Sequence, residues 1–142
     1  MGDPETEAVM TRIEGDFADM LYACADGTLD KVHYAQSEKT AVTVMMVSGG
    51  YPEAYEKGKV ITGFDPLCGC VAFHAGTARD EQGMVVTSGG RVIAVTAQGD
   101  SIEEARQKAY ENVKKIVFEG VNYRRDIGED LMGRINNLEF TD

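Results

Sequence analysis

Two apolar runs that each stop at Ser-Gly-Gly constrain the fold of this chain more than any other feature. The first, AVTVMMVSGGYP, spans residues 41–52, and the second, MVVTSGGRVIAVT, spans residues 84–96. Runs that are rich in β-branched residues and bounded by glycine or proline are typical of β-strands. The middle of the chain is therefore expected to be β-rich, with strands near residues 41–47, 59–64, 70–75, 84–87 and 91–97.

The two Ser-Gly-Gly segments allow more than one interpretation. Gly89 and Gly90 suit a two-residue hairpin turn, which requires positive φ angles. Ser48, Gly49 and Gly50 lead into a longer polar loop and are not explained by a tight hairpin. Glycine also lets a backbone approach a ligand closely, and successive N–H groups can hold an anion. The segments are therefore either ordinary turns or ligand-binding loops.

The N-terminal part of the chain has a helical pattern. Residues 3–26 are expected to be helical, with Asp3 as the cap, Pro4 at the first helical position and Gly27 as the stop. Gly15 is a possible break between two apolar stripes within this segment. This helical segment ends well before the first strand, so we expect it to belong to another structural unit. At the opposite end of the chain, residues 136–142 are expected to be weakly held.

The clearest helix begins at Ser101, which can form a capping box with Glu104. An apolar stripe at helical spacing follows, formed by Ile102, Ala105, Ala109, Val113 and Ile116. A helical N-terminal segment, an antiparallel β-rich region and one long packed helix together predict an α+β fold.

The charge of the chain argues against several classes of partner. It carries 24 acidic and 14 basic residues, which gives a formal net charge of −10. Such a chain should bind neither nucleic acid nor an anionic membrane surface, because both require a positive surface. No apolar run is long enough to span a membrane, and acidic residues follow Met1 where a secretory signal would be basic and apolar. A cytoplasmic location is expected.

The three cysteines are Cys24, Cys68 and Cys70, and an odd number without a secretory signal fits a reducing compartment. Cys-Gly-Cys at residues 68–70 could hold a soft metal, or its thiols could be buried near the start of a strand. No Cys or His pair at zinc-like spacing accompanies it. We therefore expect structural thiols and no metal.

The residues alone provide few candidates for catalysis. The chain has no nucleophile motif, phosphate-binding loop or metal triad, so no catalytic residue is assigned. His33 is expected to be solvated and His74 to be a hydrogen-bonded structural residue. Arg91 is expected to share a strand face with Ile93 and Val95, at the turn end of the strand. There it could bind a carboxylate or phosphate, or it could be an ordinary surface arginine.

Six segments, in this order, resemble the C-terminal part of the phosphoribosylamine–glycine ligase family (glycinamide ribonucleotide synthetase), which belongs to the ATP-grasp superfamily. They are GDPET (2–6), SGGYP (48–52), YEKGKVITG (55–63), FHAGT (73–77), TSGGRVIAVTAQGDSIEEARQKAY (87–110) and FEGVNYRRDIG (118–128). The resemblance covers nearly the whole chain. Ser88 stands where the family usually has asparagine, Glu129 and Asp130 depart from the family pattern, and Cys-Gly-Cys is not a family feature.

The resemblance implies a ligase of de novo purine synthesis. The family joins glycine to 5-phosphoribosylamine through an acyl phosphate of glycine, at the expense of ATP. ATP and Mg²⁺ (or Mn²⁺) are held by ATP-grasp domains. In the family, GDPE directly follows the metal-binding residues, whereas here it directly follows Met1. We therefore expect an inactive fragment that binds no cofactor and lacks its N-terminal domains.

The resemblance also implies a domain division and a set of substrate-binding residues. Residues 1–40 are expected to be the helical end of an ATP-grasp domain, and residues 41–142 a β-rich, barrel-sandwich-like C-terminal domain. The implied substrate-binding residues are Asp3, Glu5, Ser48, Gly49, Gly50, Gly89, Gly90 and Arg91. Asp3 and Glu5 could instead be only a helix cap and a first-turn acid. A free-standing acidic β-rich module that binds a metabolite or partner is the alternative to the ligase.

Overall fold

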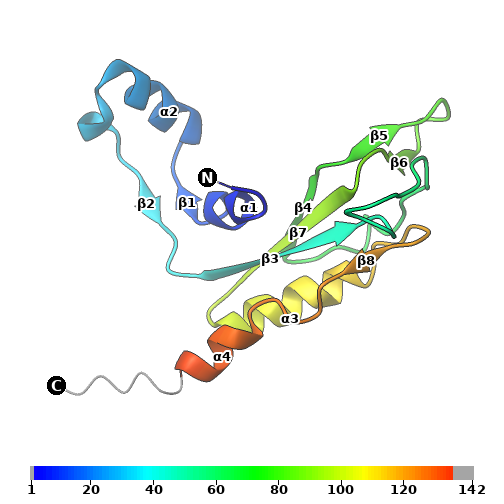
Figure 1. Ribbon diagram of the computed structural model, residues 1–142. Helices are drawn as coiled ribbons and strands as arrows, with labels where there is room; N and C mark the ends of the chain where they lie inside the picture. The colour runs from blue at the N-terminus through cyan, green and yellow to red at the C-terminus, as the bar shows by residue number, and fades with distance from the viewer. Residues whose placement is uncertain (1, 136–142) are drawn as a thin grey trace.

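The computed structural model describes residues 2–135, and Figure 1 shows their arrangement. An N-terminal unit contains α1 (Glu5–Met10), β1 (Ile13–Glu14), α2 (Phe17–Asp26), the 3-10 turn η1 (Leu29–Lys31) and β2 (Ala35–Gln36). The larger unit contains β3 (Thr40–Val47), β4 (Cys70–His74), β5 (Thr77–Arg79), β6 (Val85–Thr87), β7 (Arg91–Gly99), α3 (Ile102–Val113), β8 (Asn122–Tyr123) and α4 (Glu129–Ile135). The weakly held end that we expected at residues 136–142 lies outside the described residues.

The central feature is a four-stranded antiparallel sheet in the order β4-β7-β3-β8. Two short antiparallel ribbons, β1 with β2 and β5 with β6, accompany it. The expected α+β fold with antiparallel strands is confirmed. The expected closure towards a barrel is absent from residues 2–135, because β5 and β6 pair with each other and leave β4 as an open edge of the sheet.

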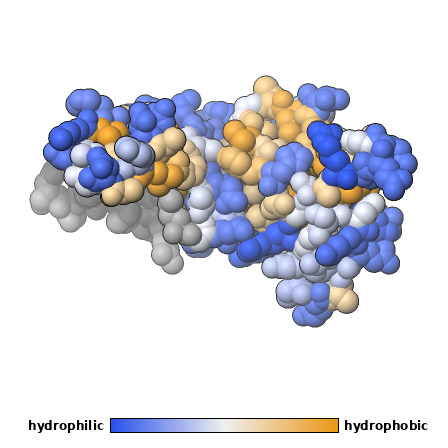
Figure 2. Space-filling model, turned by 90° about the horizontal axis from the view of Figure 1, so that it is seen from above, coloured by the Kyte–Doolittle hydropathy of each residue, from blue (hydrophilic) through white to orange (hydrophobic). Residues whose placement is uncertain are grey.

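The two faces of this sheet are covered differently. α3 lies along one face, and α1 lies against the other (Figure 1). Directly opposed residues of an antiparallel sheet point to the same face, so the register places Met45, Phe73 and Ala94 together on the α1 side. Val71, two residues before Phe73, also points to this side and is 45% exposed. Figure 2 shows apolar surface gathered over the sheet beyond the N-terminal unit.

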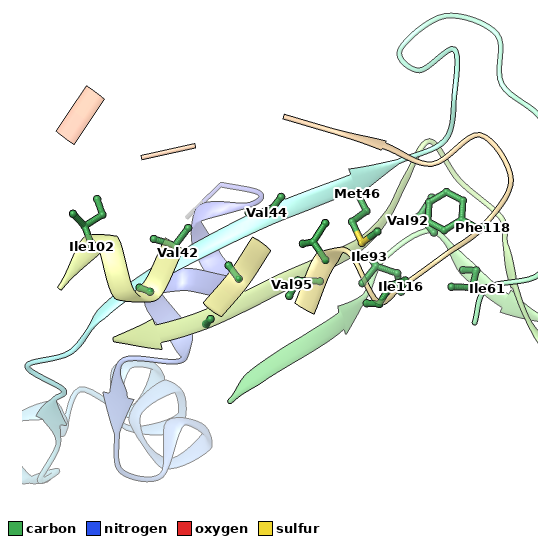
Figure 3. Close-up of a cluster of buried hydrophobic side chains, with 14 residues drawn as sticks. Val42, Val44, Met46, Ile61, Val92, Ile93, Val95, Ile102, Ile116 and Phe118 are labelled. Carbon is green, nitrogen blue, oxygen red and sulfur yellow. The ribbon is translucent and has the colours of Figure 1, made fainter. Parts of the chain in front are cut away.

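The hydrophobic core lies between the sheet and α3 (Figure 3). Val44 and Val95 face each other across the strands and are fully buried. Burying a side chain of this size contributes roughly 1.5–3 kcal/mol. The facing side of α3 carries Ala105 and Ala109, which are also fully buried. These small side chains let the helix lie close to the sheet, which explains why the apolar stripe contains alanines.

The start of α3 is fixed by its cap. Ser101 Oγ accepts a hydrogen bond from the Glu104 N–H at 3.2 Å, as the capping-box prediction requires. The Glu104 carboxylate accepts from the N–H of Asp100 at 2.7 Å, one residue earlier than in the usual box. The sequence therefore predicted the helix start correctly and the reciprocal bond to within one residue.

The N-terminal helical segment agrees with its prediction except at its start. The possible break at Gly15 is confirmed, because the segment divides into α1 and α2, with β1 and the positive φ of Gly15 between them. Pro4 occupies the N-cap position and no side chain caps α1, so the prediction of Asp3 as the cap is wrong. The stop at Gly27 is confirmed by its left-handed conformation with φ 71°.

Two predictions in the β-rich region are wrong. Residues 59–64 form only isolated bridges, Val60 with Val86 and Thr62 with Val117. Gly63 turns the chain there with φ 92°, and an added Cβ would lie 1.8 Å from the Lys115 carbonyl oxygen. The expected hairpin at Gly89 and Gly90 is absent, because β6 pairs with β5 and β7 pairs with β3 and β4.

Across residues 2–135, no helix has both the length and the apolar character needed to cross a membrane.

Candidate functional site

The two Ser-Gly-Gly segments lie side by side. Because β3 and β7 are antiparallel, the end of β3 reaches the start of β7. The Ser48 N–H donates to the Gly90 carbonyl oxygen at 2.8 Å, and Ser48 Oγ donates to the Gly89 carbonyl oxygen at 3.0 Å. Ser48 is only 4% exposed, so this hydroxyl is a buried link between the two loops. We call residues 48–51 and 88–91 together the double-glycine surface.

In the first loop, the glycines are required by the turn itself. The Tyr51 N–H donates to the Ser48 carbonyl oxygen at 3.1 Å, which closes a four-residue turn. Gly50 has φ 94°, and an added Cβ would lie 2.1 Å from the Ala54 carbonyl oxygen. A Cβ on Gly49 would lie 2.8 Å from the Gly120 carbonyl oxygen. Gly49 and Gly50 are exposed residues, and within residues 2–135 their N–H groups have no hydrogen-bond acceptor, so they could bind an anion.

In the second loop, the glycines serve close packing rather than positive φ. Neither Gly89 nor Gly90 has a positive φ, which corrects the turn prediction. The Gly76 carbonyl oxygen accepts from the N–H groups of Ser88 at 2.8 Å and Gly89 at 3.2 Å. These two N–H groups are therefore already engaged. A Cβ on Gly90 would lie 2.1 Å from the ring of Tyr51, which packs against this glycine.

Arg91 lies at the rim of the double-glycine surface and reaches the N-terminal segment. Its Nη2 atom lies 2.9 Å from Oδ2 of Asp3, and both side chains are a little under half exposed. Such an exposed pair is typically worth about 0–1 kcal/mol. A guanidinium has five N–H donors, so Arg91 keeps donors for an anionic ligand while it contacts Asp3.

The expected face of Arg91 is wrong because the ladder contains a bulge. The register shifts between Met46 and Val47, so Ile93 lies opposite Met46 but Arg91 lies opposite Val47. Met46 belongs to the core beneath α3, and successive strand residues alternate in direction. Arg91 therefore points to the face that α1 contacts, where Asp3 is within reach, and not to the face of Ile93.

The remaining predicted site residue, Glu5, is not brought to this surface. It lies exposed in the first turn of α1, and its carboxylate folds back towards Gly2. No hydrogen bond or ion pair joins Glu5 to residues 48–51 or 88–91 in the described part of the chain. The structure thus unites seven of the eight predicted residues and leaves Glu5 apart.

An ion cluster borders the first loop. Lys59 Nζ lies 2.7 Å from a carboxylate oxygen of Glu56 and 2.9 Å from one of Glu119, next to the Gly120 that Gly49 contacts. The hydrogen bonds that the Lys59 ammonium donates to the two carboxylates raise the pKa of Lys59, and the ammonium lowers the pKa of Glu56. The lysine therefore stays charged and ties the loop after Tyr51 to the loop before β8.

Sequence reasoning missed Tyr51 and Gly76 as parts of this site. Tyr51 packs on Gly90, and Gly76 is so close to the second loop that an added Cβ would lie 2.4 Å from the Arg91 carbonyl oxygen. Both residues stand within the quoted segments SGGYP and FHAGT. The segments that carry the family resemblance therefore contained both residues. Their contact with the second loop could not be deduced, because it depends on the order of the strands in the sheet.

The histidines and cysteines lie away from the double-glycine surface. His33 is exposed, as expected, and His74 Nδ1 lies 3.0 Å from Thr77 Oγ1, within hydrogen-bond distance as expected. Cys68 is exposed and Cys70 half-buried, so the expectation of two buried thiols is wrong for Cys68. In the described part of the chain, no three His, Cys, Asp or Glu side chains are grouped closely enough to hold a metal ion.

A hollow of about 690 Å³ lies elsewhere, between α3 and the segment that follows β8. Arg106, Tyr110 and Tyr123 line it, with acidic and basic side chains around them. None of the residues implied by the family resemblance lies there. The double-glycine surface is instead an open surface that faces the N-terminal segment.

Comparison with known proteins gives a consistent result. The family model described as "Phosphoribosylglycinamide synthetase, C domain" matches residues 41–130. A phosphoribosylamine–glycine ligase of Neisseria meningitidis is 44% identical over 94% of this chain and 32% of its own length. The corresponding ligase of Chlorobaculum tepidum is 48% identical over 90% of this chain and 31% of its own length.

A solved structure agrees with these relatives. The crystal structure of phosphoribosylamine–glycine ligase from Thermotoga maritima matches with a TM-score of 0.72 and 38% identity. The match covers 89% of this chain and 31% of that chain. The chain thus spans about a third of the length of the relatives it matches.

Proposed function

The chain belongs to the family of the phosphoribosylglycinamide synthetase C domain, and from this we propose that it forms the C-terminal part of an ATP-dependent ligase. The ligase joins glycine to 5-phosphoribosylamine in purine biosynthesis. Its small-molecule substrates are glycine, 5-phosphoribosylamine and ATP. In this proposal, the preceding ATP-grasp domains hold ATP and Mg²⁺ or Mn²⁺. The cytoplasmic location stays a prediction.

The domain division is part of this proposal. Residues 1–40 are the end of the ATP-grasp domain, and residues 41–142 are the C domain. Two observations support the boundary. The family model begins at residue 41, and α2 has large apolar side chains that are exposed. Leu21 is 56% and Tyr22 74% exposed, as expected of a helix whose packing partner is the preceding part of a longer chain.

The observation that carries the proposed site is the meeting of three separate segments at one surface. Asp3 comes from the N-terminal unit, Ser48 and Gly49 from the end of β3, and Arg91 from the start of β7. Arg91 offers a planar set of donors that matches the phosphate of 5-phosphoribosylamine. Gly49 and Gly50 follow Ser48, which bonds to Gly89 and Gly90, and their N–H groups would supply further donors. Asp3 contacts Arg91, and its carboxylate can accept a hydrogen bond from an amine.

Substitution of Arg91 in the complete ligase tests this assignment. A charge-assisted hydrogen bond is worth about 1.5–3 kcal/mol, which is roughly ten- to a hundredfold in KM. Arg91→Ala should therefore raise KM for 5-phosphoribosylamine by that factor and leave KM for ATP and glycine nearly unchanged. Arg91→Lys should restore only part of the loss, because lysine lacks the planar fork.

Arg79→Ala is the matched control for this experiment. Arg79 is an exposed arginine on β5 whose Nη1 donates to the Gly83 carbonyl oxygen at 2.7 Å, away from the double-glycine surface. Its replacement should leave all three KM values unchanged. An equal rise of the three KM values in Arg91→Ala, or no rise at all, would show that Arg91 does not bind the phosphate.

A further inference from the structure

The Cys-Gly-Cys segment is a feature of this chain that the ligase function does not explain. Cys68 is exposed, whereas Cys70 is the first residue of β4 and packs partly against the hydrophobic core. Gly69 stands between them in the left-handed conformation with φ 64°, and open space surrounds the position of its missing Cβ. A small reagent can therefore approach Cys68, while Cys70 lies behind it at the edge of the sheet.

The backbone of this segment is held by a buried side chain. Asn112 of α3 is 2% exposed. Its Oδ1 accepts from the Cys68 N–H at 3.0 Å, and its Nδ2 donates to the Cys68 carbonyl oxygen at 2.8 Å. Lys115 Nζ donates to the same Oδ1 at 3.0 Å and to the Pro66 carbonyl oxygen at 2.9 Å. The first cysteine is thus fixed against α3 by its main chain, and its thiol remains exposed.

The spacing of the two cysteines suits a bond between them. Residues separated by one other residue have Cα atoms at most about 7 Å apart, even in a fully extended chain. A disulfide requires a Cα separation of about 4.4–6.8 Å. A turn at the left-handed Gly69 makes the separation shorter than in an extended chain, which favours that range.

We propose that Cys68 and Cys70 form a reversible dithiol site that closes to a Cys68–Cys70 disulfide by exchange with a low-molecular-weight disulfide, such as glutathione disulfide. The Cys68 thiolate attacks one sulfur of glutathione disulfide, whose S–S bond breaks and releases one glutathione thiolate. Cys70 then loses its proton to solvent, and its sulfur attacks the Cys68 sulfur of the mixed disulfide. The second glutathione leaves, so two protein thiols are oxidised while one glutathione disulfide is reduced to two glutathiones.

The environments of the two thiols indicate which cysteine reacts first. Cys68 is the exposed attacking thiol. Burial raises the pKa of the Cys70 thiol, although the ammonium of Lys115 and the backbone of Cys68 partly offset this. Cys70 is therefore mostly protonated in the resting protein and acts second. A hollow of about 420 Å³ is lined by Gly69, Cys70 and Val71. It gives the departing glutathione room beside the two cysteines.

The test uses this chain with Cys24→Ser, which removes the third thiol, an exposed one on α2. The protein is incubated with excess glutathione disulfide, quenched with iodoacetamide and weighed by mass spectrometry. We expect the loss of both remaining thiols, no bound glutathione, and a mass lower than that of the reduced protein by two hydrogen atoms. Reduction by dithiothreitol should restore both thiols.

Two variants in the same background serve as controls. Cys70→Ser should stop at the first step and carry one glutathione on Cys68, whereas Cys68→Ser should react much more slowly. Circular dichroism checks that each variant keeps its fold. The proposal is overturned if the parent protein keeps both thiols, carries a separate glutathione on each, or forms disulfides only between chains. The readout needs no ligase activity, so its result is independent of the proposed function.

Discussion

Single glycines in the double-glycine surface perform two different physical tasks. Gly50 adopts a backbone conformation that other residues avoid, and its neighbour at close range is a main-chain oxygen. Gly90 has no positive φ, and its close neighbour is the Tyr51 side chain. Main-chain atoms in a turn cannot move aside easily, whereas a half-exposed ring can rotate. The two glycines should therefore differ in their tolerance of a methyl group.

Alanine substitution of these glycines tests the difference. Gly50→Ala should lower the free energy of unfolding by about 2 kcal/mol or more, because the strain of positive φ adds to the contact with Ala54. Gly90→Ala should cost less, about 1 kcal/mol, because Tyr51 can move away. Urea unfolding of both variants measures which substitution lowers the free energy of unfolding more.

Tyr51→Ala provides the matched check. It should recover stability in the Gly90→Ala background, where it removes the contacting ring, and should recover none in the Gly50→Ala background. An equal cost for the two glycine substitutions would contradict the proposed division of tasks.

At the scale of elements, prediction succeeded where local chemistry is decisive. The cap at Ser101, the stop at Gly27, and strands β3 and β7 follow from patterns within a few residues. The hairpin at residues 89–90 failed because strand pairing is not local. The two apolar runs are adjacent in one sheet, but the strand beside β7 in the sequence pairs elsewhere. Likewise, the face of Arg91 depends on a bulge in the ladder, which period-two alternation cannot show.

The cap of α3 gives a direct test at this scale. Ser101→Ala removes the hydroxyl that accepts from the Glu104 N–H and should lower the free energy of unfolding by about 1 kcal/mol. Ser101→Asp, which keeps an acceptor, should retain most of that stability. Chemical denaturation of the unsubstituted protein and the two variants measures these differences. Equal stabilities would mean that water replaces the hydrogen bond of the cap.

A second test concerns the side chain that ties the segment after β8 to α3. The Tyr110 hydroxyl donates to the Arg124 carbonyl oxygen at 2.7 Å and accepts from the Ile127 N–H at 3.2 Å. Tyr110→Phe removes both bonds and should cost about 1–2 kcal/mol near neutral pH.

The same pair of proteins should also differ in pH dependence. Burial raises the pKa of Tyr110 above its usual 10.0, with smaller opposing effects from the Ile127 N–H and Arg106. A raised pKa means that the folded protein favours the protonated hydroxyl. Its contribution is therefore fully present below pH 10 and is lost as the pH rises through the higher folded-state value. The stability gap to Tyr110→Phe should narrow above pH 10, and a constant gap would contradict this account.

For the whole molecule, the contrast between its two parts is the main result. Residues 40–123 surround a core of fully buried side chains, whereas α2 buries only Ala23. The chain also spans about a third of the length of its relatives. The larger part therefore has a core of its own and is expected to fold by itself. The N-terminal unit exposes apolar side chains of the kind that usually pack against another part of a protein.

The predicted consequence is a folded chain that does not bind nucleotide. Isothermal calorimetry with Mg-ATP should show no saturable binding at millimolar concentration, because residues 2–135 provide no metal-binding cluster and the chain has a net charge of −10. A cooperative thermal transition should be seen in the same sample. Saturable binding in the micromolar range would contradict the proposal that the ATP site lies outside this chain.

The position of β7 at the centre of the sheet also affects how the chain can be synthesised. β3 and β4 are translated first, yet each pairs with β7 and not with the other. At about 5–20 residues per second, a nascent chain waits several seconds between the end of β3 and the arrival of β7. During that time AVTVMMV is an unpaired apolar segment with high β-propensity, the kind of segment that chaperones bind and that aggregates when it is unprotected. The ribosome-bound intermediate, rather than the finished protein, is therefore the stage at which this fold is most vulnerable.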